Sequence, residues 1–176
     1  MFLNAQNKQT VWDIVKPLRD LGIPTVGIVD IDVIKEGGEV WNKVLNGIYL
    51  PELSHESYRN NRTNLKKAFD NISGKNMKCD GGVNLLNGSE KDFCLDFFKH
   101  LSDYGCFVVP VGEIERWLEN LDIERGKSSW LRNIFDKMGD DPDLDGYIKP
   151  TDGDVWDFIG KVSKWINDPN KKGIPK

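Results

Sequence analysis

The length, composition and charge of the chain are those of a single folded domain. Its 176 residues are 39% hydrophobic and 30% charged, a balance that excludes disordered and fibrous proteins. The formal net charge of -4 argues against broad, sequence-independent binding of nucleic acid by this chain alone, because that mode needs a dense basic surface.

The sequence also predicts a cytoplasmic protein that does not enter a membrane. Cys79, Cys94 and Cys106 form no CxxC pair, so neither a disulfide framework nor a zinc site is indicated. The start of the chain lacks the basic and apolar regions of an export signal, and no later apolar run approaches a bilayer-spanning length.

The first 34 residues predict a strand, a helix and a second strand. A short apolar run covers 2–5, apolar residues recur at helical spacing over 11–21, and Pro17 should bend that helix. The segment 25–34 is β-branched and apolar except for Asp30 and Asp32. This order predicts a βαβ unit whose second strand is buried and parallel.

The rest of the chain predicts more helices and one further strand. Helices are expected at 39–45, 56–69, from Ser89 onward, at 112–118, at 129–138 and at 154–166, and a strand is expected at 106–111. The predicted fold is α/β, with a mainly parallel central sheet of the Rossmann type flanked by helices. We expect a core at 1–120, with a helical insertion at about 39–88, and a C-terminal helical extension at 121–176 packed on it.

The acidic residues at the strand ends suggest a metal site. Side chains alternate along a strand, so Asp30 and Asp32 should share one face, roughly 7 Å apart. Glu113 follows the strand at 106–111, and ligands of open parallel sheets bind at the carboxyl ends of the strands. Carboxylates suit Mg²⁺ or Mn²⁺, and a pair of such ions can hydrolyse a phosphodiester without histidine. Glu113 and Glu115 could instead stabilise the start of a helix.

The segments GIVDIDVI and CFVVPVGEIERWL resemble the DxD and late-glutamate motifs of Toprim domains. The chain is most similar to the C-terminal Toprim region of OLD (overcoming lysogenisation defect) family and related AAA ATPase-associated endonucleases, which act in phage defence. The resemblance spans about residues 2–118. It implies Asp30, Asp32 and Glu113 as catalytic metal ligands, Glu115 as an alternative acid, and Lys127 as a partner for the scissile phosphate.

The resemblance also implies that part of the catalytic domain comes from elsewhere. Toprim domains carry a catalytic glutamate after a first strand, and this chain has no match to that strand. We therefore expect the chain to be a C-terminal fragment of an ATP-dependent nuclease that cuts DNA. Its partners are expected to be an N-terminal ATPase region or a separate ATPase subunit, and the chain can form a homodimer.

A calcium site is one alternative for another acidic segment. Asp141, Asp143, Asp145 and Gly146 match the acidic positions and the glycine of an EF-hand loop, although Asp152 stands where that loop has a bidentate glutamate.

Two alternatives concern the function of the whole chain. A haloacid-dehalogenase-like phosphatase would use Asp30 as nucleophile and Asp140 with Asp145 as its late acidic motif. A catalytically incomplete docking module would contact a partner through the aromatic helices; the residues concerned are Trp130, Trp156 and Trp165.

Overall fold

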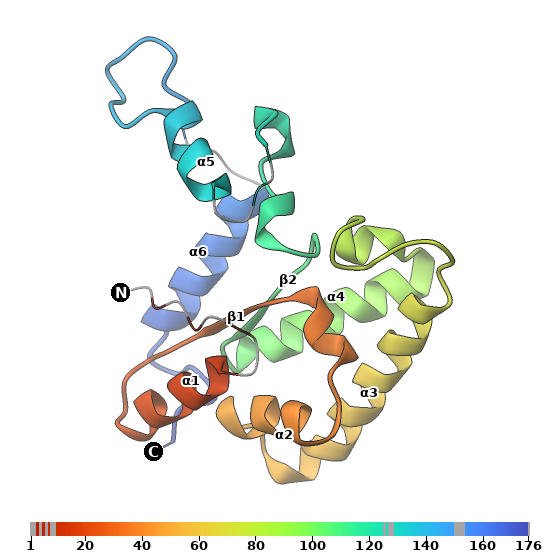
Figure 1. The fold of residues 1–176 in the computed structure, drawn as a ribbon. Coiled ribbons are helices and arrows are strands. Elements are labelled where there is room, and N and C mark those ends of the chain that lie inside the picture. The colour runs from red at the N-terminus through yellow and green to blue at the C-terminus, as the bar shows by residue number, and fades with distance from the viewer. Residues whose placement is uncertain are drawn as a thin grey trace.

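Helices make up most of the fold, and two short parallel strands run through them (Figure 1). The structure is a computed structural model that describes residues 3, 5, 7, 10–124, 126, 129–149 and 154–175, without the side chains of Asn120 and Asp154. The α-helices are α1 (Val11–Asp20), α2 (Gly38–Gly47), α3 (Glu52–Asp70), α4 (Gly88–Asp103), α5 (Trp130–Met138) and α6 (Asp154–Asn167). The strands are β1 (Gly27–Asp30) and β2 (Cys106–Val109). Short 3₁₀ helices are η1 (Ile31–Lys35), η2 (Gly82–Leu85), η3 (Ile114–Arg116) and η4 (Glu119–Leu121).

The two strands form a parallel sheet in which Asp30 lies opposite Val109. Because side chains alternate across a strand, Cys106 and Val108 enter the larger core, whereas Phe107 faces α6. The prediction of an α/β fold is confirmed at this level. The sheet of the described residues has only two strands, so the fold is mainly helical.

The larger core lies between the sheet and helices α1 to α4. Trp12, Trp41 and Phe97 are each at most 2% exposed, and Trp41 stacks with Phe97 at 6.3 Å between ring centroids. At about 25 cal/mol per Å² of apolar area removed from water, side chains of this size supply much of the stability. This core fixes β1 and β2 relative to the helices that carry the rest of the chain.

A second apolar cluster connects the end of β2 with α5 and α6. Trp117 and Trp130 are both buried in it, and Phe158 of α6 packs against Trp117 at 4.8 Å between ring centroids. The cluster contains residues from both sides of the boundary expected at residue 120, and that boundary stays a prediction.

Arg19 joins four backbone segments from inside the protein. Its side chain is fully buried and donates hydrogen bonds to the carbonyl oxygens of Thr25, Tyr104, Gly105 and Gly173 at 2.8 to 3.3 Å. Burial lowers the pKa of the guanidinium to about 10. The bonds tie α1 to the approach to β1, to the α4–β2 turn and to the C-terminal segment.

Two of the three cysteines are buried. Cys94 in α4 and Cys106 in β2 lie in the larger core, and burial raises the pKa of each thiol to about 12. Cys79 is exposed, and all three are free thiols.

Several predicted elements differ in the structure. The expected strand at 25–34 ends at Asp30, and the expected helix at 112–118 is reduced to η3, because Trp117 leaves the helical path to enter the second cluster. Helix α4 begins after Asn87 without a side-chain cap, rather than at Ser89. The expected strand at 2–5 lies partly outside the described residues, and Leu3 and Ala5 are not in a strand. In the described ranges, no helix has the length and apolar character needed to cross a membrane.

Candidate active site at the carboxyl ends of the strands

The strand that carries Asp30 ends at that residue, and the chain then turns into η1. Ile31 N–H donates a hydrogen bond of 2.9 Å to Gly112 O, which ties the start of η1 to the turn after β2. The prediction that both aspartates share one strand face is therefore wrong, since η1 instead buries its apolar side chains in the core. Asp32 lies in the first turn of η1, and its Oδ1 is buried.

Arg62 of α3 holds the far end of η1. Its Nη1 donates hydrogen bonds to Ile34 O at 3.0 Å and to Glu36 O at 2.6 Å. The guanidinium also lies 5.9 Å from the ring centroid of Trp41, within cation–π range. The turn that presents Asp32 is thus fixed at both of its ends.

Lys78 reaches the same edge of the sheet from the loop between α3 and α4. Two glycines let this loop lie against the turn after β2. Gly82 has φ +59° and Gly112 has φ +118°, and a Cβ on either would stand under 3.0 Å from backbone of the opposite segment. Val83 N–H completes the contact with a hydrogen bond of 2.8 Å to Pro110 O. Close backbone packing therefore determines where Lys78 lies.

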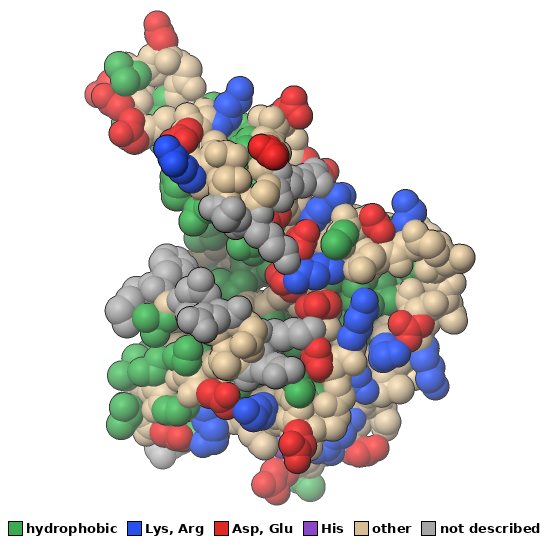
Figure 2. All heavy atoms as spheres, in the orientation of Figure 1, with side chains coloured by type: hydrophobic (Ala, Val, Ile, Leu, Met, Phe, Trp, Pro, Cys, Tyr) green, Lys and Arg blue, Asp and Glu red, His purple; other side chains and the backbone are tan. Residues whose placement is uncertain are grey.

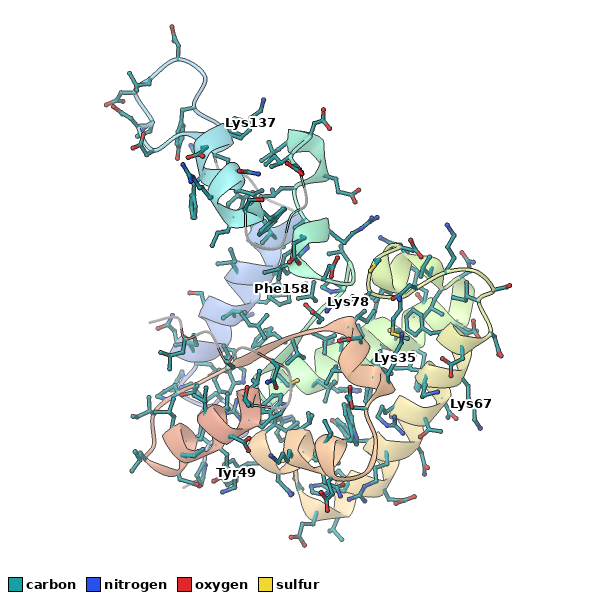
Figure 3. All side chains as sticks on the ribbon, viewed as in Figure 1. Lys35, Tyr49, Lys67, Lys78, Lys137 and Phe158 are labelled. Atoms are coloured by element: carbon teal, nitrogen blue, oxygen red, sulfur yellow. The ribbon has the colours of Figure 1, made fainter. Side chains whose placement is uncertain are left out.

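The ammonium of Lys78 lies between the ends of the two strands (Figure 3). Its Nζ is 2.6 Å from Asp30 Oδ2 and 3.9 Å from Glu113 Oε2. Burial alone would lower the pKa of Lys78, but the hydrogen bond to Asp30 and the charges of Asp30, Asp32 and Glu113 outweigh it and raise the pKa. Three of the predicted acids therefore act on one cation at this edge.

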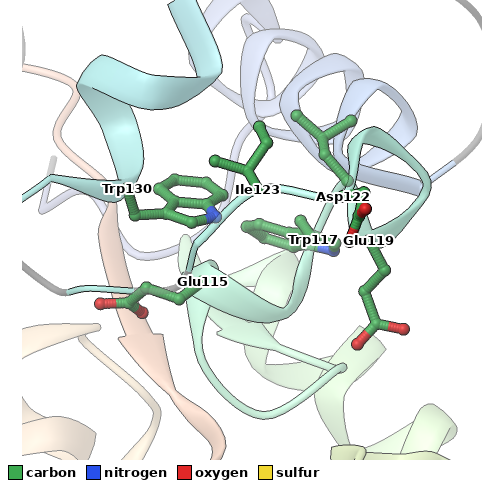
Figure 4. A pocket seen from close by; sticks show the side chains of 7 residues that line it. Glu115, Trp117, Glu119, Asp122, Ile123 and Trp130 are labelled. Atoms are coloured by element: carbon green, nitrogen blue, oxygen red, sulfur yellow. The ribbon is translucent and has the colours of Figure 1, made fainter. Parts of the chain in front are cut away.

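Glu115 points to a different place. It lines a pocket of about 80 Å³ together with Trp117 and Trp130, beside Glu119 and Asp122 (Figure 4). Of the two late glutamates that the sequence suggests as metal ligands, only Glu113 lies at the same lysine as Asp30 among the described contacts. Lys127, the predicted phosphate partner, lies outside the described residues.

The carboxylates fit a divalent cation in the kind of atom they offer, since Mg²⁺ and Mn²⁺ prefer oxygen ligands. Within the described part of the chain, no three Asp, Glu, His or Cys side chains stand close enough to hold a metal ion. The Lys78 ammonium already pairs with Asp30 and Glu113 and offsets one of their two negative charges. A divalent ion would compete with this ammonium for the same oxygens.

Sequence reasoning missed Lys78. Nothing in periodicity or charge marks a lysine in a loop, and its place depends on a contact with a turn some thirty residues later. A usable signal was present, because the lysine stands shortly before Gly81 and Gly82. Adjacent glycines suggest a tight turn or a close backbone approach.

The acidic segment after α5 is separate from this site. Asp140, Asp141, Asp143 and Asp145 are exposed in a turn at the outer end of α5, away from β1 (Figure 1). Asp141 Oδ1 accepts a hydrogen bond of 2.9 Å from Asp143 N–H, as in an ordinary Asx turn. The phosphatase alternative requires these acids to lie near Asp30, and the structure does not place them there. Asp152 of the EF-hand alternative lies outside the described residues.

The tryptophans proposed as partner contacts lie largely inside the protein. Trp130 and Trp165 are each 7% exposed, and Trp156 packs against the second cluster. Trp165 Nε1–H donates a hydrogen bond of 3.0 Å to Asp103 O. These side chains stabilise the fold and leave little surface for a partner.

Comparisons of this chain with protein-family models, with curated proteins and with solved structures gave no match in any of the three. The function of the chain is therefore inferred from the residues at the strand ends.

Proposed function

We propose that the chain is a Toprim-like nuclease domain that hydrolyses phosphodiester bonds of DNA with Mg²⁺ or Mn²⁺. The observation that carries this proposal is the position of Lys78 Nζ, 2.6 Å from Asp30 and 3.9 Å from Glu113. It shows that acids from two distant segments meet at the carboxyl edge of a parallel sheet. Such edges are where ligands of α/β folds bind.

Each residue of the site has a role in this proposal. Asp30 and Glu113 would hold the cation in place of the Lys78 ammonium, and Asp32 would add its negative charge nearby. The ion would supply activation of a water and polarisation of a phosphate oxygen. Lys78, released from the carboxylates, would place its positive charge against the phosphate group. Gly82 and Gly112 fix the loop that carries this lysine.

The finer parts of the proposal rest on the sequence resemblance. By that resemblance, the chain is proposed to form the C-terminal part of an OLD-like, AAA ATPase-associated endonuclease of phage defence that acts in the cytoplasm. The net charge of -4 agrees with a domain that obtains its DNA affinity from an ATPase region or subunit.

A cleavage assay on supercoiled plasmid DNA tests the proposal. The purified chain is incubated with Mn²⁺ or Mg²⁺ beside Asp30→Asn and Glu113→Gln variants prepared in the same way. Asp96→Asn and Glu90→Gln, which change exposed acids of α4, are the matched controls.

We expect slow metal-dependent nicking by the wild type and by both controls, slow because the chain has no match to the Toprim strand that carries the catalytic glutamate. Nicking should fall at least about a hundredfold further in the two site variants, as is typical when an electrostatic group of the reaction is removed. Equal nicking by Asp30→Asn would identify a contaminating nuclease and contradict the proposal. Absence of nicking with either metal would also count against it.

A further inference from the structure

Helix α5 has apolar side chains on two adjoining faces, and the protein covers only one. Trp130, Ile134 and Met138 repeat at helical spacing and are each at most 7% exposed in the second cluster. Leu131 and Phe135, one helical turn apart on the outer side, are 58% and 63% exposed. Single exposed leucines are common on proteins, but an aromatic and an aliphatic side chain stacked on one helix face form a possible docking surface.

Negative charge lies at the carboxyl end of the same helix. Helix α5 ends at Gly139, whose N–H donates a hydrogen bond of 2.9 Å to Phe135 O, and an acidic turn over 140–145 follows. Ile148 N–H donates a hydrogen bond of 2.8 Å to Met138 O and so returns the chain to the helix. The acidic turn is thereby held against the carboxyl end of α5, where the helix dipole adds further negative potential.

The acidic turn contains four aspartates and no basic residue. All four aspartates are exposed, and Leu144 in the same turn is 64% exposed. Figure 2 shows acidic side chains beside hydrophobic surface at the tip of the lobe that projects from the rest of the molecule. The surface therefore combines apolar anchors with an excess of negative charge.

This combination selects among possible partners. A second copy of the chain, meeting this face symmetrically, would bring two acidic turns together, and like charges across an interface cost binding free energy. DNA is disfavoured because its phosphates would be repelled. We propose that the outer face of α5, with its acidic turn, binds a basic amphipathic segment of a partner protein. Leucine-like side chains of that segment cover Leu131 and Phe135, and its lysines or arginines face the acidic turn.

The proposal is independent of the nuclease site, and a synthetic peptide tests it. The probe is a fluorescent peptide with leucines at helical spacing and lysines at the remaining positions; a second peptide has glutamates in place of the lysines. Binding to the full chain is measured by fluorescence anisotropy at low and high salt. The variants are Leu131→Ser with Phe135→Ser, and the triple change of Asp141, Asp143 and Asp145 to Asn.

Leu53→Ser is the matched control, because Leu53 is 99% exposed on α3. We expect the wild type and the control to bind the lysine peptide alike. The apolar double variant should weaken binding about tenfold or more, since aromatic anchors dominate such interfaces. The triple variant should weaken it severalfold at low salt and less at high salt. Circular dichroism verifies that each variant is folded.

Three results would overturn the proposal: no binding of the lysine peptide, equal binding of the glutamate peptide, or unchanged binding by the apolar double variant. Sedimentation equilibrium gives a further test. A dimer of the wild type that Phe135→Ser converts to a monomer would show that a second copy, rather than a basic segment, covers this face.

Discussion

Replacement of Arg19 by methionine should destabilise the protein strongly, because one buried guanidinium satisfies several backbone carbonyls. Gly105 O keeps a second bond from Gly27 N–H at 3.0 Å, so the loss falls mainly on the carbonyls of Thr25, Tyr104 and Gly173. A buried carbonyl that loses its partner costs ~1 to 3 kcal/mol. Three such losses would cost about 6 kcal/mol in the middle of that range.

Part of this loss in stability is offset, because methionine avoids the cost of burying a charged guanidinium. Burial lowers the pKa of Arg19 from 12.5 to about 10. A pKa change of this size corresponds to roughly 3 kcal/mol of desolvation that methionine does not incur. The expected net loss in the free energy of unfolding is therefore about 3 kcal/mol, or a fall in Tm of roughly 10 °C for a chain of this length.

Urea denaturation followed by circular dichroism measures this loss. Arg132→Met is the control, because that side chain on α5 is 84% exposed and should change the stability by less than about 0.5 kcal/mol. Arg19→Lys keeps a charge but lacks the planar fork of donors, so it should recover less than half of the loss. A stability of Arg19→Met within about 1 kcal/mol of the wild type would refute the role given to these bonds.

Three further expectations follow from the core and the site. Ellman's reagent at pH 8 should modify Cys79 alone in the native protein and all three thiols in denaturant. The buried thiols have a pKa of about 12 in the folded protein and 9.0 when unfolded, so the free energy of unfolding should fall as the pH rises above about 9. Gly82→Ala should cost at least about 2 kcal/mol more than Gly74→Ala, since both glycines have positive φ but only at Gly82 would a Cβ strike backbone; equal losses in urea denaturation would contradict this. Lys78→Met should raise the affinity for Mn²⁺ about tenfold by removing a competing cation, whereas Lys75→Met, in the same loop, should not; an unchanged affinity in calorimetry would argue against that competition.

The sequence predicts a helix closely where its apolar periodicity is clear. The pattern predicts a helix at 11–21, and α1 lies at Val11–Asp20; the predicted ends of α5 and α6 are within a residue or two of the observed ends. In these segments a single amphipathic face meets the core, so local pattern and tertiary packing agree.

The segment after Asp30 could not be predicted in the same way. Its β-branched residues suit a strand, but Ile31 N–H bonds to Gly112 O from a turn far along the chain, and the chain folds into η1. Local propensity is overridden here by a long-range backbone contact. The place of Asp32 depends on that contact.

The candidate site was predicted in part. Asp30 ends β1 and Glu113 comes shortly after the paired strand β2, so their approach follows from a general rule about strand ends. Lys78 was missed, because it is placed by the packing of Gly82 against the turn after β2. Such an approach between two loops leaves only its glycines as a trace in the sequence.

Calorimetric titration with Mn²⁺ tests most directly the claim that the strand ends form a cation site. The wild type, Asp30→Asn, Glu113→Gln and the control Asp96→Asn are titrated at one salt concentration. If these carboxylates hold the ion, the wild type and the control bind with equal affinity, and each site variant binds at least about tenfold more weakly. Equal Mn²⁺ affinity in all four proteins, or no binding by the wild type, would contradict the account.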